Sequence, residues 1–179
     1  MRKAVALALL LGFAVMAGAA PPLPRKSPEF SIVEPSGKKT LLSSYRGKVV
    51  LLAFMYTTCI HCQRQSQILE KLYDEMKPRG LQALGVTFNE NAKNLAPDFI
   101  KQFKLQYPVG YSDSKAVLGY LGFSPNDNWV VPQIVVIDRR GRIRAQSPPD
   151  GDPNLQDENN LRKLIDGLLK EHPAAKKTS

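Results

Sequence analysis

The chain carries two cysteines, Cys59 and Cys62, which are separated by Ile60 and His61. They follow the apolar run VVLLAFMY and precede residues with helical spacing, so we expect them where a buried strand gives way to a helix. The start of a helix presents unpaired N–H groups and a partial positive charge, which stabilise a thiolate there. We therefore expect Cys59 to be the attacking thiol. Cys62 lies about one helical turn behind it and can resolve the mixed disulfide by closing a small disulfide ring.

The two cysteines could instead belong to a metal site. A structural zinc ion usually takes four ligands, but the chain has no third cysteine, and its only histidines are His61 and His172 in the tail. Covalent haem attachment needs a histidine directly after the second cysteine, where this chain has Gln63. The pattern therefore favours redox chemistry of the thiols, with no metal and no cofactor.

Apolar and helical periodicities predict an α/β domain around this pair. Extended segments are expected at FSIV and KKTLL, as an N-terminal β-hairpin, and then at VVLLAFMY, LQALGVTF, residues 107–110, QIVVID and RIRAQ. Helices are expected from the cysteines to Pro78, over residues 95–103 and 115–121, and over a closing amphipathic segment at 161–169. The uninterrupted run before the cysteines suits a central strand that is covered on both faces.

Three segments, in this order, resemble the thioredoxin-fold oxidoreductases of the TlpA/ResA group: GKKTLLSSYRGKVVLLAFMYTTCIHC, LQALGVTF and VPQIVVIDRRGRI. The resemblance extends from about Phe30 to Leu169. It implies a thioredoxin-like fold with a mixed sheet of four or five strands flanked by helices. It also implies a redox disulfide between Cys59 and Cys62, and a cis peptide bond before Pro132 that faces the disulfide and holds partner chains. Proteins of this group are exported and exchange disulfides with partner proteins.

Pro132 opens the expected strand QIVVID. Because proline cannot donate a ladder hydrogen bond, one interpretation is that it simply begins the strand. The other, which the resemblance supports, is the cis bond of the site. In that case we expect Val131, Trp129 and Ile60 to line the substrate groove, although Trp129 could equally pack on the core.

Several positions depart from the TlpA/ResA pattern. Thr58 stands where the group usually has a tryptophan, and Gln65 and Gln67 stand where it often has an acidic residue and a proline. Ala53 occupies the place of the buried aspartate of thioredoxin itself. These departures weaken the assignment to a subgroup. They also mean that the sequence names no acceptor for the proton of Cys62.

His61 occupies a place that is also histidine in the strongly oxidising DsbA-type enzymes, which the motif partly resembles. A partly protonated imidazole near the Cys59 sulfur would stabilise the thiolate more than the disulfide, and thereby raise the reduction potential. The alternative is a solvent-facing residue without a redox role. We expect His61 to tune the pair toward oxidation.

Two other function classes compete with a thiol–disulfide oxidoreductase. A peroxiredoxin-like peroxidase shares the fold, but its usual pattern places a threonine three residues before the reactive cysteine and a proline further back, where this chain has Tyr56 and Leu52. A copper-binding or copper-delivery protein could use soft thiolates and a histidine. Related copper carriers usually have a wider cysteine spacing and a distant histidine, and no histidine lies between Cys62 and His172.

The N-terminus reads as a signal peptide over residues 1–19. It has a basic start, an apolar stretch from Ala4 to about Met16 and small residues that favour cleavage after Ala19. An uncleaved membrane anchor is the alternative, although the run is short for a bilayer span. We expect an exported protein, in the bacterial periplasm, without a stable membrane span after cleavage.

Behind the leader we expect a proline-rich spacer over residues 20–29, the thioredoxin-like domain over 30–170 and a flexible basic tail over 171–179. The net charge of +9, from 25 Lys and Arg against 16 Asp and Glu, could attract nucleic acid, acidic lipid or acidic proteins. Because these residues are scattered along the sequence, we expect a solvated surface and no nucleic-acid partner. The expected partners are protein thiols and disulfides, together with an unidentified recycling partner.

Overall fold

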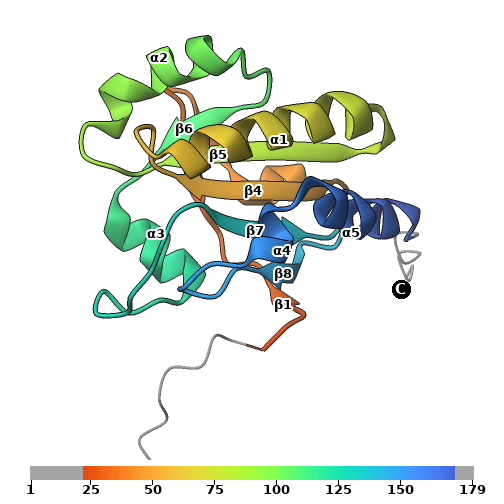
Figure 1. Cartoon of the computed structure of the whole chain (residues 1–179). Helices are drawn as coiled ribbons and strands as arrows, with labels where there is room; N and C mark the ends of the chain where they lie inside the picture. The colour runs from red at the N-terminus through yellow and green to blue at the C-terminus, as the bar shows by residue number, and fades with distance from the viewer. Residues whose placement is uncertain (1–21, 172–179) are drawn as a thin grey trace, which may run out of the picture.

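The computed structural model describes residues 22–171, in which one mixed sheet is covered by helices on both faces (Figure 1). The order of its strands is β1-β8-β7-β4-β5-β6-β2-β3. The strands are β1 (Arg25–Lys26), β2 (Ser31–Val33), β3 (Lys39–Leu41), β4 (Val49–Met55), β5 (Leu81–Thr87), β6 (Val109–Tyr111), β7 (Gln133–Ile137) and β8 (Arg142–Gln146). The sheet therefore has eight strands, and the four or five that the resemblance implies were too few. Short strands at both edges account for the difference.

The four expected helices are present in the expected order, and the short helix α4 is an addition that the sequence did not predict. They are α1 (Ile60–Met76), α2 (Ala92–Phe103), α3 (Ser114–Leu121), α4 (Pro153–Gln156) and α5 (Glu158–Lys170), with 3₁₀ turns η1 (Leu42–Tyr45) and η2 (Lys77–Arg79). The long helix α1 ends just before Pro78, as proline and the following glycine predict. None of the helices described for residues 22–171 is long and apolar enough to cross a membrane.

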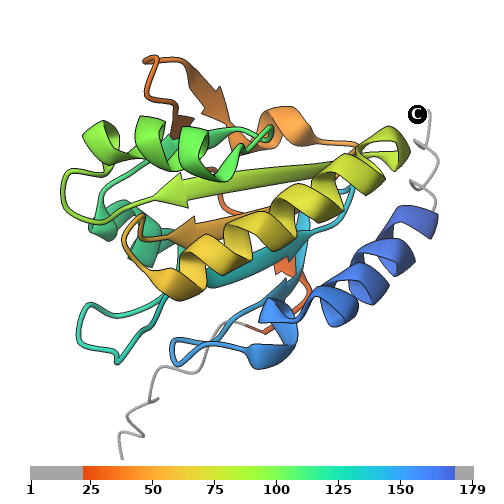
Figure 2. The same ribbon diagram turned by 45° about the horizontal axis from the view of Figure 1, so that its top comes forward.

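The central strand β4 explains how the core is divided. It pairs in parallel with β5 and antiparallel with β7, and all seven of its residues are buried. Alternate side chains of a strand point to opposite faces. Leu51 and Met55 therefore pack with α1, α2 and α5, whereas Leu52 and Phe54 pack with α3 and the β2–β3 hairpin. Figure 2 shows α1 and α5 side by side over one face of the sheet.

The β2–β3 hairpin joins the sheet through β6, where Gly110 lets the strands approach closely. A Cβ atom built on Gly110 would lie 2.6 Å from Cγ2 of Ile32 and 2.8 Å from the carbonyl oxygen of Val33. The backbone oxygen has no room to retreat, because Val33 pairs with Tyr111 across the same contact. Glycine is thus required at this position for the hairpin to dock.

The first described residues are part of the domain. Arg25 and Lys26 pair with β8, and the backbone N–H of Ser27 donates to the carbonyl oxygen of Gly141 at 3.0 Å. The Ser27 hydroxyl is buried and lies 2.9 Å from the hydroxyl of Tyr120. Within the range expected as a spacer, Arg25 and Lys26 thus lie in the sheet and Ser27 is buried. The expected signal peptide and the basic tail beyond residue 171 lie outside the described residues.

Candidate functional site

The two cysteines lie at the start of α1, where the chain leaves the C-terminal end of β4. Cys59 is the N-cap residue, and its sulfur accepts a hydrogen bond from the backbone N–H of Cys62 at 3.4 Å. Cys59 is half-buried and Cys62 has no exposed surface. Both are free thiols in this structure. Only Cys59 is therefore placed to meet a partner, with Cys62 directly behind it.

Burial also sets the protonation of Cys62. Loss of solvent raises the pKa of its thiol far above the ordinary value, and the neighbouring Cys59 raises it further. The backbone N–H of Tyr56 donates to the Cys62 sulfur at 3.4 Å and opposes this shift. In the reduced protein Cys62 therefore keeps its proton at neutral pH.

Among residues 22–171, no buried carboxyl group lies beside Cys62 to accept its proton. Among the buried residues of the described range, the only carboxylate is Asp138, which follows the opposite end of β7. Gln65 is buried one helical turn after Cys62, and its side-chain nitrogen has no hydrogen-bond partner in the structure. The structure thus agrees with the sequence in naming no carboxylate acceptor for Cys62.

Pro132 lies next to the thiols although 70 residues separate it from Cys62 in the sequence. The Val131–Pro132 bond is cis, and Pro132 is buried. The Cys59 thiol points at the carbonyl oxygen of Val131, 3.9 Å away. The structure therefore brings together Cys59, Cys62, Val131 and Pro132, as the sequence predicts.

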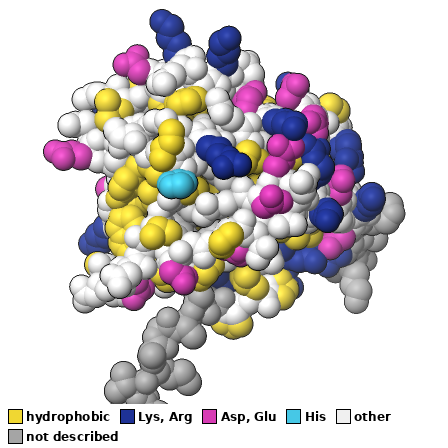
Figure 3. Space-filling view, viewed as in Figure 1, with side chains coloured by type: hydrophobic (Ala, Val, Ile, Leu, Met, Phe, Trp, Pro, Cys, Tyr) yellow, Lys and Arg dark blue, Asp and Glu magenta, His cyan; other side chains and the backbone are white. Residues whose placement is uncertain are grey.

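Of the remaining expected residues, Ile60 lies at the rim of the site, together with Val130, which the sequence did not single out. Ile60 is 70% exposed and Val130 is 45% exposed, so an apolar surface flanks the half-buried thiol. Hydrophobic side chains gather on this part of the surface in Figure 3. Trp129 is half-buried and packs against Phe88 and Tyr56, with ring centroids 5.8 Å and 6.3 Å away, which corresponds to the core-packing interpretation of this residue.

His61 is exposed in the first turn of α1. No hydrogen bond or ion pair of its side chain is found among residues 22–171, so any effect of His61 on Cys59 acts through space and not through a direct bond. No cluster of three or more His, Cys, Asp or Glu side chains suited to a metal ion is found within that range either.

Sequence reasoning missed Gln133, which directly follows the cis bond. Its buried side-chain nitrogen donates to the carbonyl oxygens of Val130 at 2.8 Å and Pro149 at 3.0 Å, and the Val130 N–H donates to the same Pro149 oxygen. These three hydrogen bonds, which we call the Gln133 clasp, connect the loop before Pro132 to the loop after β8. Nothing in the local sequence distinguishes a clasping glutamine, because its partners lie in two different loops.

A second set of hydrogen bonds, which sequence reasoning also missed, holds the turn that leads into Cys59. The side-chain oxygen of Asn89 accepts a hydrogen bond from the N–H of Thr57 at 3.0 Å, and its nitrogen donates to the Thr57 hydroxyl at 3.1 Å. Gln63 donates to the Thr57 carbonyl at 3.0 Å. The turn is thereby tied both to the end of β5 and to α1, which keeps Cys59 at its N-cap position.

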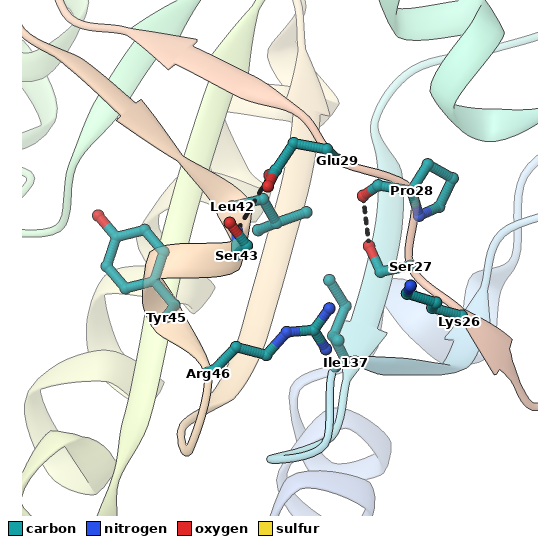
Figure 4. Close-up of a pocket in the computed structure, with 10 residues that line it drawn as sticks. Lys26, Ser27, Pro28, Glu29, Leu42, Ser43, Tyr45, Arg46 and Ile137 are labelled. Atoms are coloured by element: carbon teal, nitrogen blue, oxygen red, sulfur yellow. Dashed lines mark hydrogen bonds between the residues drawn. The ribbon is translucent and has the colours of Figure 1, made fainter.

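A cavity of about 480 Å³ lies well away from these thiols (Figure 4). It is bounded by residues 26–29, by η1 and by Ile137 at the far end of β7. Cations and an acid face one another across it, since Lys26, Arg46 and Glu29 all line its wall. The cavity is therefore separate from the redox site.

Comparisons with known proteins agree with this geometry. The profile of the AhpC/TSA family matches residues 24–146. Thiol-disulfide oxidoreductase ResA of Bacillus thuringiensis (strain Al Hakam) is 26% identical over 122 residues, which cover 68% of this chain and 67% of that protein. Its counterpart in Geobacillus kaustophilus (strain HTA426) is 30% identical over 118 residues, which cover 66% and 64%. The expected resemblance to the TlpA/ResA group is thus confirmed.

Solved structures support the fold. A putative thiol:disulfide interchange protein DsbE from Chlorobium tepidum superposes with a TM-score of 0.69 at 23% identity, covering 82% of this chain and 96% of its own. A putative protein disulfide isomerase from Bacteroides thetaiotaomicron gives 0.68 at 26% identity, covering 84% and 91%. The α/β thioredoxin-like fold expected from the sequence is confirmed.

Proposed function

The chain belongs to the AhpC/TSA family, and from that premise we propose that it is an exported thiol–disulfide oxidoreductase that exchanges its Cys59–Cys62 pair with partner proteins. The observation that carries the proposal is the unequal burial of two adjacent thiols. Cys59 is accessible, caps a helix and faces the Val131 carbonyl, whereas Cys62 is enclosed behind it. A nucleophile in front of a resolving thiol is the arrangement that disulfide exchange requires.

Exchange runs in two steps. The Cys59 thiolate attacks a partner disulfide, so that a Cys59–partner bond forms, the partner S–S bond breaks and one partner sulfur leaves as a thiolate. Cys62 then loses its proton and attacks the Cys59 sulfur, which forms the Cys59–Cys62 disulfide and releases the second partner sulfur. Two electrons pass to the partner. The reverse sequence oxidises a partner dithiol.

The raised pKa of Cys62 orders these steps. A protonated Cys62 cannot compete for the incoming disulfide, so the first attack comes from Cys59 alone. The leaving partner thiolate lies close to Cys62 once the mixed disulfide has formed. We propose this thiolate as the base that takes the Cys62 proton, since the buried residues of the range 22–171 include no carboxylate beside Cys62.

The partner chain is held beside Val131. Pro132 has no backbone N–H, so the N–H of Val131 is the donor that remains between the apolar rim and the thiol. Among residues 22–171 this N–H donates no backbone hydrogen bond. An extended segment can pair with this edge while its side chains contact Ile60 and Val130. Recognition through backbone and apolar contacts suits partners of varied sequence, and a separate redox protein would recycle the pair.

Trapping of mixed disulfides tests the exchange. In a Cys62→Ala variant the second step is removed, so partner proteins should remain bound to Cys59 through bonds that dithiothreitol breaks. The matched Cys59→Ala variant should trap none. If both variants captured the same proteins, or if the wild-type protein consumed hydrogen peroxide rapidly while leaving protein disulfides intact, a peroxidase would be the better description.

The proposed export has its own test. Removal of residues 1–19 leaves a chain that begins with Ala20, and mass spectrometry of the protein recovered from the bacterial periplasm should find that N-terminus. Recovery of the chain only in the membrane fraction, with Met1 intact, would identify the leader as an anchor.

A further inference from the structure

Basic side chains that are scattered in the sequence gather at the end of the molecule opposite the dithiol. Six of them form what we call the basic pole: Lys26, Arg46, Lys48, Arg139, Arg140 and Arg142. They lie on β1, between η1 and β4, in the turn between β7 and β8, and at the first residue of β8. In Figure 3 Lys and Arg side chains, interspersed with Asp and Glu, lie along the edge near the end of α5, whereas hydrophobic side chains gather toward the other edge.

Hydrogen bonds show that these residues form one surface. Arg46 donates to the carbonyl oxygen of Arg140 at 2.5 Å, and Arg139 donates to that of Gly47 at 2.8 Å. Lys26 is paired with Arg142 between β1 and β8. Lys26 and Arg46 also line the same cavity, where Figure 4 shows both side chains near Ile137.

No member of the pole forms an ion pair within the described residues, although Glu29 lines the cavity with Lys26 and Arg46, and Asp138 accepts hydrogen bonds from the backbone N–H groups of Arg140 and Arg142. Nearby Arg79 and Arg144 form ion pairs with Asp166 and Glu171, but no carboxylate lies within ion-pair distance of any of the six residues in the range 22–171. The polar partners of Arg46, Arg139 and Arg142 are backbone carbonyl oxygens, which hold the side chains without cancelling their charge. Such a surface attracts an anionic partner.

We propose that the basic pole docks the protein on an anionic lipid surface. Charge complementarity is the first argument, since clustered Lys and Arg side chains each add to binding at acidic headgroups. The second is the place where the chain enters the fold. Arg142 donates to the carbonyl oxygen of Pro24 at 2.9 Å, so the polypeptide arrives beside the pole. The apolar stretch that ends near Met16 lies eight residues before Pro24, a reach of at most about 29 Å, so the pole stays near a membrane for as long as the leader is attached, which favours a membrane over a nucleic acid.

Docking in this way leaves the redox site free. The pole meets the C-terminal end of α1 through Arg139, which donates to the carbonyl oxygen of Arg79, and Cys59 caps the opposite end of that helix. A helix of 17 residues is about 25 Å long. That distance exceeds the roughly 8 Å over which charges act at physiological salt. The lipid surface can thus hold the protein without altering the thiols.

Vesicle binding tests the proposal. The full chain is mixed with vesicles of phosphatidylglycerol and phosphatidylcholine in equal parts, or of phosphatidylcholine alone, and sedimented. The pole variant carries four substitutions to glutamine at exposed positions: Lys26→Gln, Lys48→Gln, Arg140→Gln and Arg142→Gln. The matched control loses the same charge on α2, at its C-cap and on α3: Lys93→Gln, Lys101→Gln, Lys104→Gln and Lys115→Gln. The leader is present in every sample, so it contributes equally.

We expect the wild-type protein and the control to prefer the anionic vesicles, and the pole variant to lose at least about tenfold in affinity for them. High salt should weaken the preference. Equal losses in both variants would show a mere effect of net charge and overturn the proposal. So would tighter binding of a DNA duplex than of vesicles at equal phosphate concentration, which would assign the pole to nucleic acid.

Labelling on the vesicles reports the orientation. Cys59 of the bound, reduced protein should react with a membrane-impermeant maleimide as fast as in solution, because the pole faces the lipid. Protection of Cys59 would mean that the apolar rim around Ile60 and Val130 makes the contact, and would contradict the proposal. Disulfide exchange by the pole variant should equal that of the wild type, so this test is independent of the proposed redox function.

Discussion

At the scale of single residues, the site depends on a contrast between two chemically identical side chains. Cys59 and Cys62 stand three positions apart, yet one is half-buried and the other has no exposed surface. The same helix turn produces both environments, because Cys59 caps it from outside while Cys62 points into the core beneath β4. The division of labour between attacking and resolving thiol is thus a matter of burial.

Alkylation rates should follow that burial. In the reduced protein near neutral pH, iodoacetamide should modify Cys59 at least about tenfold faster than Cys62, which reacts only after local opening. Peptide mass spectrometry of samples quenched at different times measures both rates. The Cys59→Ala variant, which keeps Cys62, should lack the fast phase. Faster modification of Cys62 in the wild type would reverse the assignment of the nucleophile.

His61 should make the couple more oxidising. It is exposed on the first turn of α1, two residues after Cys59, and a cationic ring there would favour the reduced form. A His61→Pro variant should therefore have a lower reduction potential in equilibration with glutathione. Proline is tolerated in the first helical turn, so the fold should persist. A His61→Gln variant separates the loss of charge from the change of backbone, and unchanged potentials in both variants would contradict the tuning role.

At the scale of secondary structure elements, the success of prediction depended on how local each signal is. The strand β4 and the helix α1 were predictable because apolar runs and helical spacing are contained in the segments themselves. The strand β1 was missed because two residues show no periodicity, and its pairing with β8 joins positions more than a hundred residues apart. The hydrogen bonds of Gln133 were not predicted for the same reason, because their acceptors lie in two loops that are distant in the sequence.

The docking of the β2–β3 hairpin offers a test at this scale. A Gly110→Ala substitution places a methyl group against the backbone of Val33, so it should destabilise the protein by about 1–3 kcal/mol in urea denaturation. Gly119→Ala is the matched control, because a Cβ atom there meets nothing within 4 Å and alanine favours the helix. Equal stabilities of the two variants would mean that the close approach at Gly110 is not needed.

At the scale of the whole molecule, the N-terminal segment is fastened to the body of the domain by a buried hydroxyl pair. The Ser27 hydroxyl lies 2.9 Å from that of Tyr120, whose ring also packs edge-on against Phe30. Burial raises the pKa of Tyr120 to about 12, and the contact with Ser27 opposes the rise. The fold therefore prefers the protonated phenol.

This preference predicts a loss of stability in alkali. The pKa of Tyr120 in the folded protein lies above its ordinary value of 10.0, so its contribution is complete below pH 10 and is lost as the pH rises toward about 12. Other buried groups, including Cys62, act in the same direction. A Tyr120→Phe variant should lose up to about 3 kcal/mol less than the wild type across that window, measured by urea unfolding. Parallel pH profiles of the two proteins would contradict this account.

The position of the basic pole is likewise a property of the whole molecule. Lys26, Lys48 and Arg140 are far apart in the sequence, and only the meeting of β1, β4 and the β7–β8 turn brings them to one surface. Charge counting could establish the excess of positive residues but not its position. By contrast, the site residues Cys59 and Pro132 were found from the sequence, because the motif around each carries its own signature.

The two ends of the sheet have a consequence for how the protein behaves among unfolded chains. The outermost strands, β1 and β3, have two and three residues, and each contains a lysine. Short, charged edges discourage the edge-to-edge pairing by which sheets seed aggregates. The proposed exchange brings the protein together with extended segments of its partners. Within residues 22–171 the sheet edges are short and charged, whereas the backbone N–H of Val131 is open beside the thiol, so pairing there leads to disulfide chemistry and not to aggregation.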